Sequence, residues 1–178
     1  MRIFSWWMTA FLLAAAAAGA GELSGRRAPG FSLPDSKMRQ HDLQDYRGKV
    51  LLIDVMKTDC PHCVFLTRAL EAAQAKYGSR IAVLSVVNPP DNVSSVQAYV
   101  SQNKVTSPVV FDCGQMAASY LKVTPERPSV SVPHLFVIDA AGQIADDFAY
   151  GPQTRNIFEG QGLFPILDRL LNPAPARK

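Results

Sequence analysis

Two cysteines separated by two residues are the side chains best suited to chemistry in this sequence. Cys60, Pro61, His62 and Cys63 form a C-P-H-C motif that follows a continuous apolar run at 49–55. A disulfide between these cysteines would close a very short loop, so it would constrain the unfolded chain little and add little to stability. The motif therefore indicates thiol-disulfide exchange, with an inert structural bridge as the alternative.

The motif stands where a helix is predicted to begin, and this explains why Cys60 should react. Pro61 suits the first helical position because its missing N–H costs nothing there, which leaves Cys60 to cap the helix. The Cys60 sulfur would then face unpaired backbone N–H groups and the positive end of the helix dipole, and both favour a thiolate. A protonated His62 would lower the pKa of Cys60 further. We expect Cys60 to attack and Cys63, one turn on, to resolve the mixed disulfide.

Asp54 is a carboxyl inside a predicted strand that otherwise calls for apolar side chains. A buried acid is costly unless it is paired or used, and burial raises its pKa toward neutrality. Because Asp54 stands six residues before Cys60, we expect it beneath Cys63, where it could take or give protons. A hydrogen-bonded structural aspartate is the alternative interpretation.

Pro133 stands before another apolar run, where a proline would remove a hydrogen bond from the sheet. We predict a cis Val132–Pro133 bond, because cis bonds in folded proteins are nearly confined to X–Pro. Such a bond could expose the Val132 backbone to an extended substrate. An ordinary trans turn would remove that role.

Apolar runs and helical spacings alternate along the chain and predict one α/β domain. Apolar residues recur at helical spacing from Cys60 to Tyr77, which predicts a helix that ends at Gly78. The continuous apolar run at 49–55 is typical of a strand buried on both faces. The other predicted elements are a hairpin within 28–49, strands at 80–87, 109–112, 133–139 and 144–150, helices at 92–103 and 115–121, and a last helix that ends near Leu171. This order predicts an α/β sandwich with a mixed central sheet, closed by an antiparallel hairpin.

Four blocks of the sequence resemble the exported TlpA/ResA-like thiol-disulfide oxidoreductases of the thioredoxin superfamily. They are APGFSLPD, LQDYRGKVLLIDV, CPHC and VPHLFVIDAAGQI, within residues 28–171. The resemblance implies a thioredoxin-like three-layer α/β/α sandwich with an N-terminal β-hairpin, a buried acid at Asp54 and a cis proline at Pro133 beside the active disulfide. It implies electron exchange with the thiols and disulfides of other proteins, including a redox partner that the sequence does not name, and no dissociable cofactor.

The chain departs from this family's pattern at Asp59, where an aromatic residue usually precedes the first cysteine. A negative charge there would oppose the effect of His62 on the pKa of Cys60. The link at 123–133 is longer than usual and is expected beside the active site. The C-P-H-C variant is typical of strong disulfide oxidases, yet oxidase, reductase and isomerase share one site, so the direction stays open. Lys57 occupies the place where a peroxiredoxin needs Thr or Ser, which disfavours peroxidase activity.

Metal binding is the other use that two cysteines allow. Zinc would need two more ligands, and the chain has neither a second C-x-x-C nor an H-x-x-x-H motif. Thiolates and imidazole suit copper, and His134 could approach the cysteines. A copper-binding chaperone that uses Cys60, Cys63 and His134 is therefore the second hypothesis, although related copper chaperones have three residues between their cysteines. A scaffold that has lost catalysis is the third, and the intact C-P-H-C motif argues against it.

Two further residues receive structural interpretations. Cys113 is predicted to end a strand at the same sheet edge as the C-P-H-C motif, where a third thiol could relay a disulfide. A lone cysteine is more often a small buried apolar residue, and we adopt that interpretation. His41 is predicted to be a solvated residue of the N-terminal hairpin.

The first residues of the chain predict export. Met1 and Arg2 precede an uncharged stretch that ends in Ala18-Gly19-Ala20, the pattern of a secretory signal peptide. We predict a signal peptide at 1–20, a monomeric thioredoxin-like domain at 21–178 and a periplasmic or other extracytoplasmic location. An uncleaved membrane anchor is the alternative. The net charge of +3 gives no electrostatic case for nucleic acid as a partner.

Overall fold

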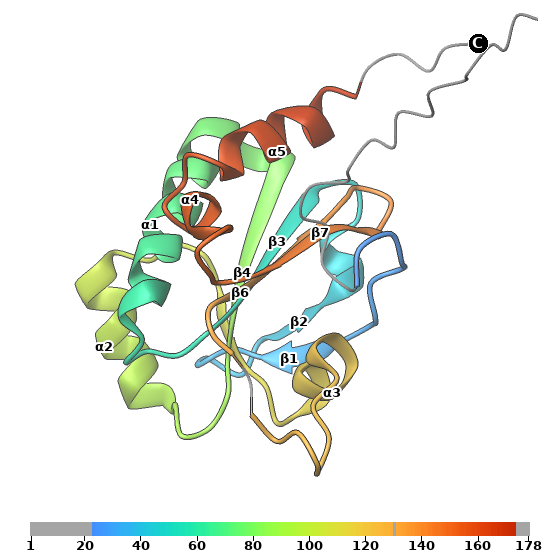
Figure 1. Ribbon diagram of the computed structural model, residues 1–178. Helices are drawn as coiled ribbons and strands as arrows, with labels where there is room; N and C mark the ends of the chain where they lie inside the picture. Colours follow the sequence, from blue (N-terminus) through green and yellow to red (C-terminus); the bar gives the residue numbers. More distant parts are fainter. Residues whose placement is uncertain (1–22, 130, 174–178) are drawn as a thin grey trace, which may run out of the picture.

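A five-stranded mixed sheet forms the centre of the computed structural model, which describes residues 23–129 and 131–173. The predicted signal peptide lies outside the described residues. The strands lie in the order β5-β4-β3-β6-β7 (Figure 1). Their bounds are β3 Val50–Met56, β4 Ile81–Val87, β5 Val109–Phe111, β6 His134–Ile138 and β7 Ile144–Ala149. β3, β4 and β5 are parallel, whereas β6 is antiparallel to β3 and β7 is antiparallel to β6. The prediction of a mixed sheet with a closing hairpin is confirmed.

Helices cover both faces of this sheet and make three layers. One face carries α1 (Pro61–Tyr77), α2 (Val93–Asn103), α4 (Arg155–Phe158) and α5 (Leu163–Leu171), and the other carries α3 (Gln115–Leu121) with the N-terminal hairpin (Figure 1). Short 3-10 turns occur at η1 (Leu43–Tyr46) and η2 (Gly78–Arg80). The predicted α/β/α sandwich is therefore present, with one short helix, α4, that the sequence did not predict.

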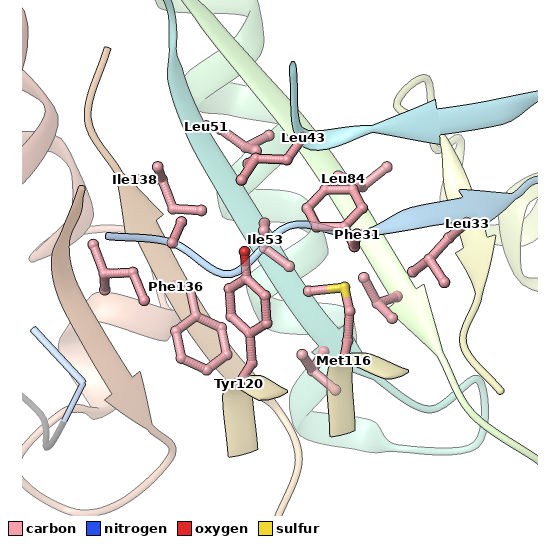
Figure 2. Close-up of a cluster of buried hydrophobic side chains, with 14 of the residues drawn as sticks. Phe31, Leu33, Leu43, Leu51, Ile53, Leu84, Met116, Tyr120, Phe136 and Ile138 are labelled. Atoms are coloured by element: carbon pink, nitrogen blue, oxygen red, sulfur yellow. The ribbon is translucent and has the colours of Figure 1, made fainter. Parts of the chain in front are cut away.

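β3 is the central strand, and all seven of its residues are buried. Because side chains alternate along a strand, Leu51 and Ile53 face the α3 layer and Leu52 faces α1. Each face of the sheet has its own hydrophobic core. Figure 2 shows the core on the α3 side around Ile53, where the Tyr120 and Phe136 rings pack edge to face with centroids 5.1 Å apart. Cover on both faces explains why the strand is continuously apolar in sequence.

The N-terminal hairpin forms a separate two-stranded sheet. It consists of β1 (Ser32–Pro34) and β2 (Gln40–Asp42), and an isolated bridge between Asp35, which follows β1, and Val110 joins it to β5. The prediction that His41 is solvated is wrong. Its imidazole lies 3.0 Å from Oη of Tyr46 and 3.3 Å from Oδ2 of Asp35, with 14% of the side chain exposed, because it closes a polar cluster inside the hairpin.

The topology brings distant segments of the chain to one edge of the sheet. The carboxyl end of β3 leads into α1, and the carboxyl end of β5 leads toward Cys113. β6 runs in the opposite direction, so its first residue, His134, pairs with Val55 near the end of β3. Pro133 therefore lies at the same edge as the C-P-H-C motif, as the sequence predicted.

Candidate active site

Cys60 and Cys63 form a disulfide at the first turn of α1, with their Cα atoms 5.3 Å apart. Cys60 is the N-cap in extended conformation, and Pro61 opens the helix. The Cys63 backbone N–H donates a hydrogen bond to Sγ of Cys60 at 3.2 Å. The helix start thus aims an amide at the sulfur that was expected to attack, which is the arrangement that favours a thiolate there.

The two sulfurs differ in their access to solvent. Cys60 is partly exposed, whereas Cys63 is completely buried in a cluster that includes Met56, Val87 and Tyr99. A large reactant can approach Cys60 from outside the protein. Cys63 itself has no exposed surface.

Asp54 is completely buried in the middle of the sheet. It shares the α1 face of β3 with Met56, which packs against Cys63, and its neighbours in register are Ser85 of β4 and Leu135 of β6. Neither carboxyl oxygen has a hydrogen-bond partner among the described residues. Burial raises the pKa of Asp54 to about 8, because the apolar surroundings disfavour the charged form. The described residues thus provide none of the hydrogen bonds that a structural aspartate would be expected to make.

Pro133 is buried, and its bond to Val132 is cis. Val132 is half-buried and packs against the same cluster as Cys60. The Pro133 carbonyl accepts a hydrogen bond of 3.2 Å from the backbone N–H of Tyr150, the residue that follows β7. A second cis bond, Pro89–Pro90, was not predicted.

The loop before Cys60 is held by a residue that sequence reasoning missed. Asp91 accepts hydrogen bonds from both the backbone N–H and the hydroxyl of Thr58, the former at 3.1 Å. The hydroxyl of Ser95 in α2 donates to the same carboxylate at 2.9 Å. An acid just before a predicted helix was the available signal, but nothing in the sequence linked it to Thr58.

His62 is exposed, yet its imidazole has a defined neighbour. Its ring stacks on the ring of Tyr150 with centroids 4.3 Å apart and an angle of 23° between the planes. Phe65, one turn along α1, lies at 6.4 Å. His62 thus contacts Tyr150, the residue that follows β7 and lies 88 residues away in the sequence.

Comparison with known proteins places this site in a family. Residues 24–146, more than half of the chain, match the sequence model of the AhpC/TSA family. The chain belongs to this family. Similar sequences include the thioredoxin-like protein YneN of Bacillus subtilis, 28% identical over 128 residues, which cover 71% of each chain. The thiol-disulfide oxidoreductase ResA of Bacillus thuringiensis is 25% identical over 136 residues, which cover 76% of this chain and 75% of ResA.

Comparison with solved structures shows the fold. A crystal structure of a thiol:disulfide interchange protein of the thioredoxin family from Chlorobium tepidum superimposes with a TM-score of 0.63 at 18% identity, covering 83% of this chain and 97% of the other. The AhpC/TSA-family chain thus has the predicted thioredoxin-like fold. Together with the ResA-like relatives, the Cys60–Cys63 pair identifies a thiol-disulfide oxidoreductase. Within 23–129 and 131–173, no helix is long and apolar enough to cross a membrane.

His134 does not join the two cysteines. Its side chain points to the α3 face of the sheet, opposite α1, because it alternates with Leu135, which faces α1. There its ring stacks on Phe136 at 4.5 Å, and Nε2 lies 3.4 Å from Oδ2 of Asp147. The part of the chain that the structure describes contains no group of three His, Cys, Asp or Glu side chains placed to hold a metal ion. The copper alternative therefore gains no support in this AhpC/TSA-family member.

Cys113 is a free cysteine at the predicted sheet edge, but it is exposed. The prediction that it is a small buried apolar residue is wrong. β5 ends at Phe111, and Cys113 lies in the turn before Gly114, which takes a positive φ of 105°. The side chain therefore follows the strand and is not part of its buried face.

Proposed function

We propose that the protein exchanges disulfides with exported protein substrates, with Cys60 as the sulfur that reacts and Cys63 as the sulfur that resolves. The observation that carries this proposal is the contrast between the two sulfurs: Cys60 is accessible at a helix N-terminus and accepts an amide hydrogen bond, whereas Cys63 is completely buried. This contrast supports an order of events in which a protein-sized thiolate meets Cys60 first.

Oxidation of a substrate then proceeds in two exchanges. A substrate thiolate attacks Sγ of Cys60, the Cys60–Cys63 bond breaks, and Cys63 leaves as a thiolate that takes up a proton. A second substrate thiolate attacks the substrate sulfur of the mixed disulfide, so the substrate disulfide forms and Cys60 leaves as a thiolate. The substrate loses two electrons and the protein gains them. Reduction of a substrate disulfide is the same sequence in reverse, and another protein closes the cycle.

Asp54 is proposed to exchange the proton of Cys63. A carboxyl with a pKa of about 8 is protonated below that pH and can give up its proton without a large cost. Its oxygens have no competing hydrogen-bond partner among the described residues, and it lies on the same face of β3 as the residues that pack on Cys63. This arrangement would supply a proton in a region that water does not reach.

Val132 and Pro133 are proposed to align the substrate. Val132 packs against the cluster of Cys60, so a chain lying along it would meet the exposed sulfur. Export is proposed from the leader pattern at 1–20, and it agrees with the chemistry because disulfides persist outside the cytoplasm.

A trapping experiment tests the proposal with the mature protein. Reduced Cys63→Ser should accumulate a mixed disulfide with a disulfide-containing protein such as insulin, because its Cys60 can attack but nothing resolves the product. Cys60→Ser should form none, although it retains Cys63, and Cys113→Ser should behave as the wild type. Equal trapping by Cys60→Ser and Cys63→Ser would contradict the assigned order. Consumption of peroxide by the wild type in place of insulin reduction would overturn the function itself.

A further inference from the structure

The imidazole of His62 stacks on the ring of Tyr150, and Tyr150 is itself held by contacts with α4 and with Pro133. Tyr150 stacks against it at 4.3 Å, and the Tyr150 ring in turn meets Phe158 of α4 edge to face at 5.4 Å and 83°. The Tyr150 backbone is tied to the Pro133 carbonyl by a hydrogen bond of 3.2 Å. Tyr150 is half-buried, so its position is set by the sheet edge and α4 and not by His62.

The face of an aromatic ring carries negative charge density and attracts cations. A stacked imidazole therefore gains more from Tyr150 when it is protonated than when it is neutral. An imidazolium next to Cys60 stabilises the thiolate, and a stabilised thiolate makes the disulfide easier to reduce. We propose that Tyr150 is a positioning residue that holds His62 over its ring face and thereby makes the Cys60–Cys63 disulfide more oxidising.

No other described group near His62 and Tyr150 holds the His62 imidazole in place. Within 23–129 and 131–173, the His62 side chain makes no hydrogen bond or ion pair, and its ring contacts are Tyr150 and Phe65. The charges close in sequence are exposed Asp59 on the loop before α1 and the positive end of the α1 dipole. On α4, Arg155 is close enough to interact with Tyr150, but its guanidinium is paired with Glu159 at 2.6 Å.

This inference deepens the proposed function and rests on it, since it assigns a determinant of redox direction to the same site. The contact joins residues from α1 and the end of β7, so it forms only in the folded domain. Tyr150 does not touch the reacting sulfurs in this scheme. Its effect on them passes through His62 alone, which makes the scheme testable by coupling.

A double-mutant cycle measures that coupling through the equilibrium constant of the protein disulfide with glutathione. Tyr150→Leu should shift the equilibrium about two- to fivefold toward the disulfide, the range of an exposed cation–π contact, which corresponds to about 9 to 21 mV at 29.6 mV per tenfold. Tyr150→Phe keeps the ring face and should retain the wild-type constant. In a His62→Ala background, Tyr150→Leu should have no effect. An equal shift in both backgrounds, or none in the wild-type background, would overturn the proposal.

A second measurement does not depend on exchange activity or on the folding of Tyr150→Leu. Ring currents of Tyr150 should move the carbon-bound imidazole protons of His62 upfield in the NMR spectrum of the wild type and of Tyr150→Phe. Random-coil shifts for these protons would contradict the stacked arrangement. If instead the shifts are present but Cys60 exchanges no disulfides, the proposed function fails while the contact stands.

Discussion

Removal of the buried carboxyl is the perturbation whose size follows most directly from the structure. Asp54→Ala deletes a completely buried acid that has no hydrogen-bond partner among the described residues. Burial raises its pKa from 3.8 to about 8 in the folded protein, whereas the unfolded chain keeps the ordinary value. Because the folded state holds its proton more tightly, the stabilising contribution of Asp54 is complete below pH 3.8 and is lost as the pH rises toward 8.

The magnitude comes from the interval between the two pKa values. At pH 7 the unfolded state has released the proton of Asp54 and the folded state has not, which costs the wild type about 4 kcal/mol relative to acid pH. Asp54→Ala abolishes this cost, so the variant should be more stable than the wild type at pH 7. Near pH 4 most of the advantage should be gone, because the pH is then close to the unfolded-state pKa of 3.8 and little of the cost of releasing the proton remains.

Guanidinium denaturation of the oxidised proteins at pH 4, 5.5, 7 and 8 measures the difference. We expect the free energy of unfolding of Asp54→Ala, relative to the wild type, to rise steadily over this range. Ser85→Ala is a matched control, since it changes the neighbouring buried residue of β4 without removing a titratable group, and its offset from the wild type should not vary with pH. Parallel pH profiles for Asp54→Ala and the wild type would refute the reasoning, because they would mean that Asp54 is ionised in the folded protein.

Two further predictions concern the first turn of α1 and the loop before it. In the reduced protein, alkylation of Cys60 by iodoacetamide should reach half its maximal rate below pH 8.5, the ordinary thiol pKa, because the helix N-terminus favours the thiolate; a midpoint near 8.5 would exclude such activation. Asp91→Ala removes two hydrogen bonds from Thr58 and one from Ser95, so it should lower the free energy of unfolding by about 2 kcal/mol. Thr58→Val removes only the bond from the Thr58 hydroxyl and should lose about 1 kcal/mol in the same urea titration. A loss equal to that of Asp91→Ala would show that the bonds from the Thr58 backbone N–H and from Ser95 contribute nothing.

Much of the fold could be predicted because its rules are local. A strand covered on both faces needs only apolar residues, and the run ending at Val55 contains little else. Likewise, a proline is favoured at the first position of a helix, so Pro61 predicts that the helix begins there and that Cys60 is its N-cap. Both predictions use neighbours within a few residues, so they do not depend on the tertiary arrangement.

The features that escaped prediction depend on pairing between distant segments. Which face His134 occupies is set by the register of β6 against β3, and a shift of one residue would have turned it toward the cysteines. The stacking of His62 on Tyr150 depends on where β7 ends relative to α1. Cys113 is exposed because β5 stops two residues earlier, and strand ends are poorly marked in sequence.

The central position of β3 in the sheet determines which parts of the protein open first on heating. This strand has a neighbour on each side and a layer over each face, so partial openings of the peripheral layers leave it intact. Loss of the first turn of α1 would set Cys60 free while the carboxyl stayed enclosed. The acid and the sulfurs would then separate before the domain unfolds, and a heated sample would lose the proton transfer proposed for Asp54 while its sheet was still whole.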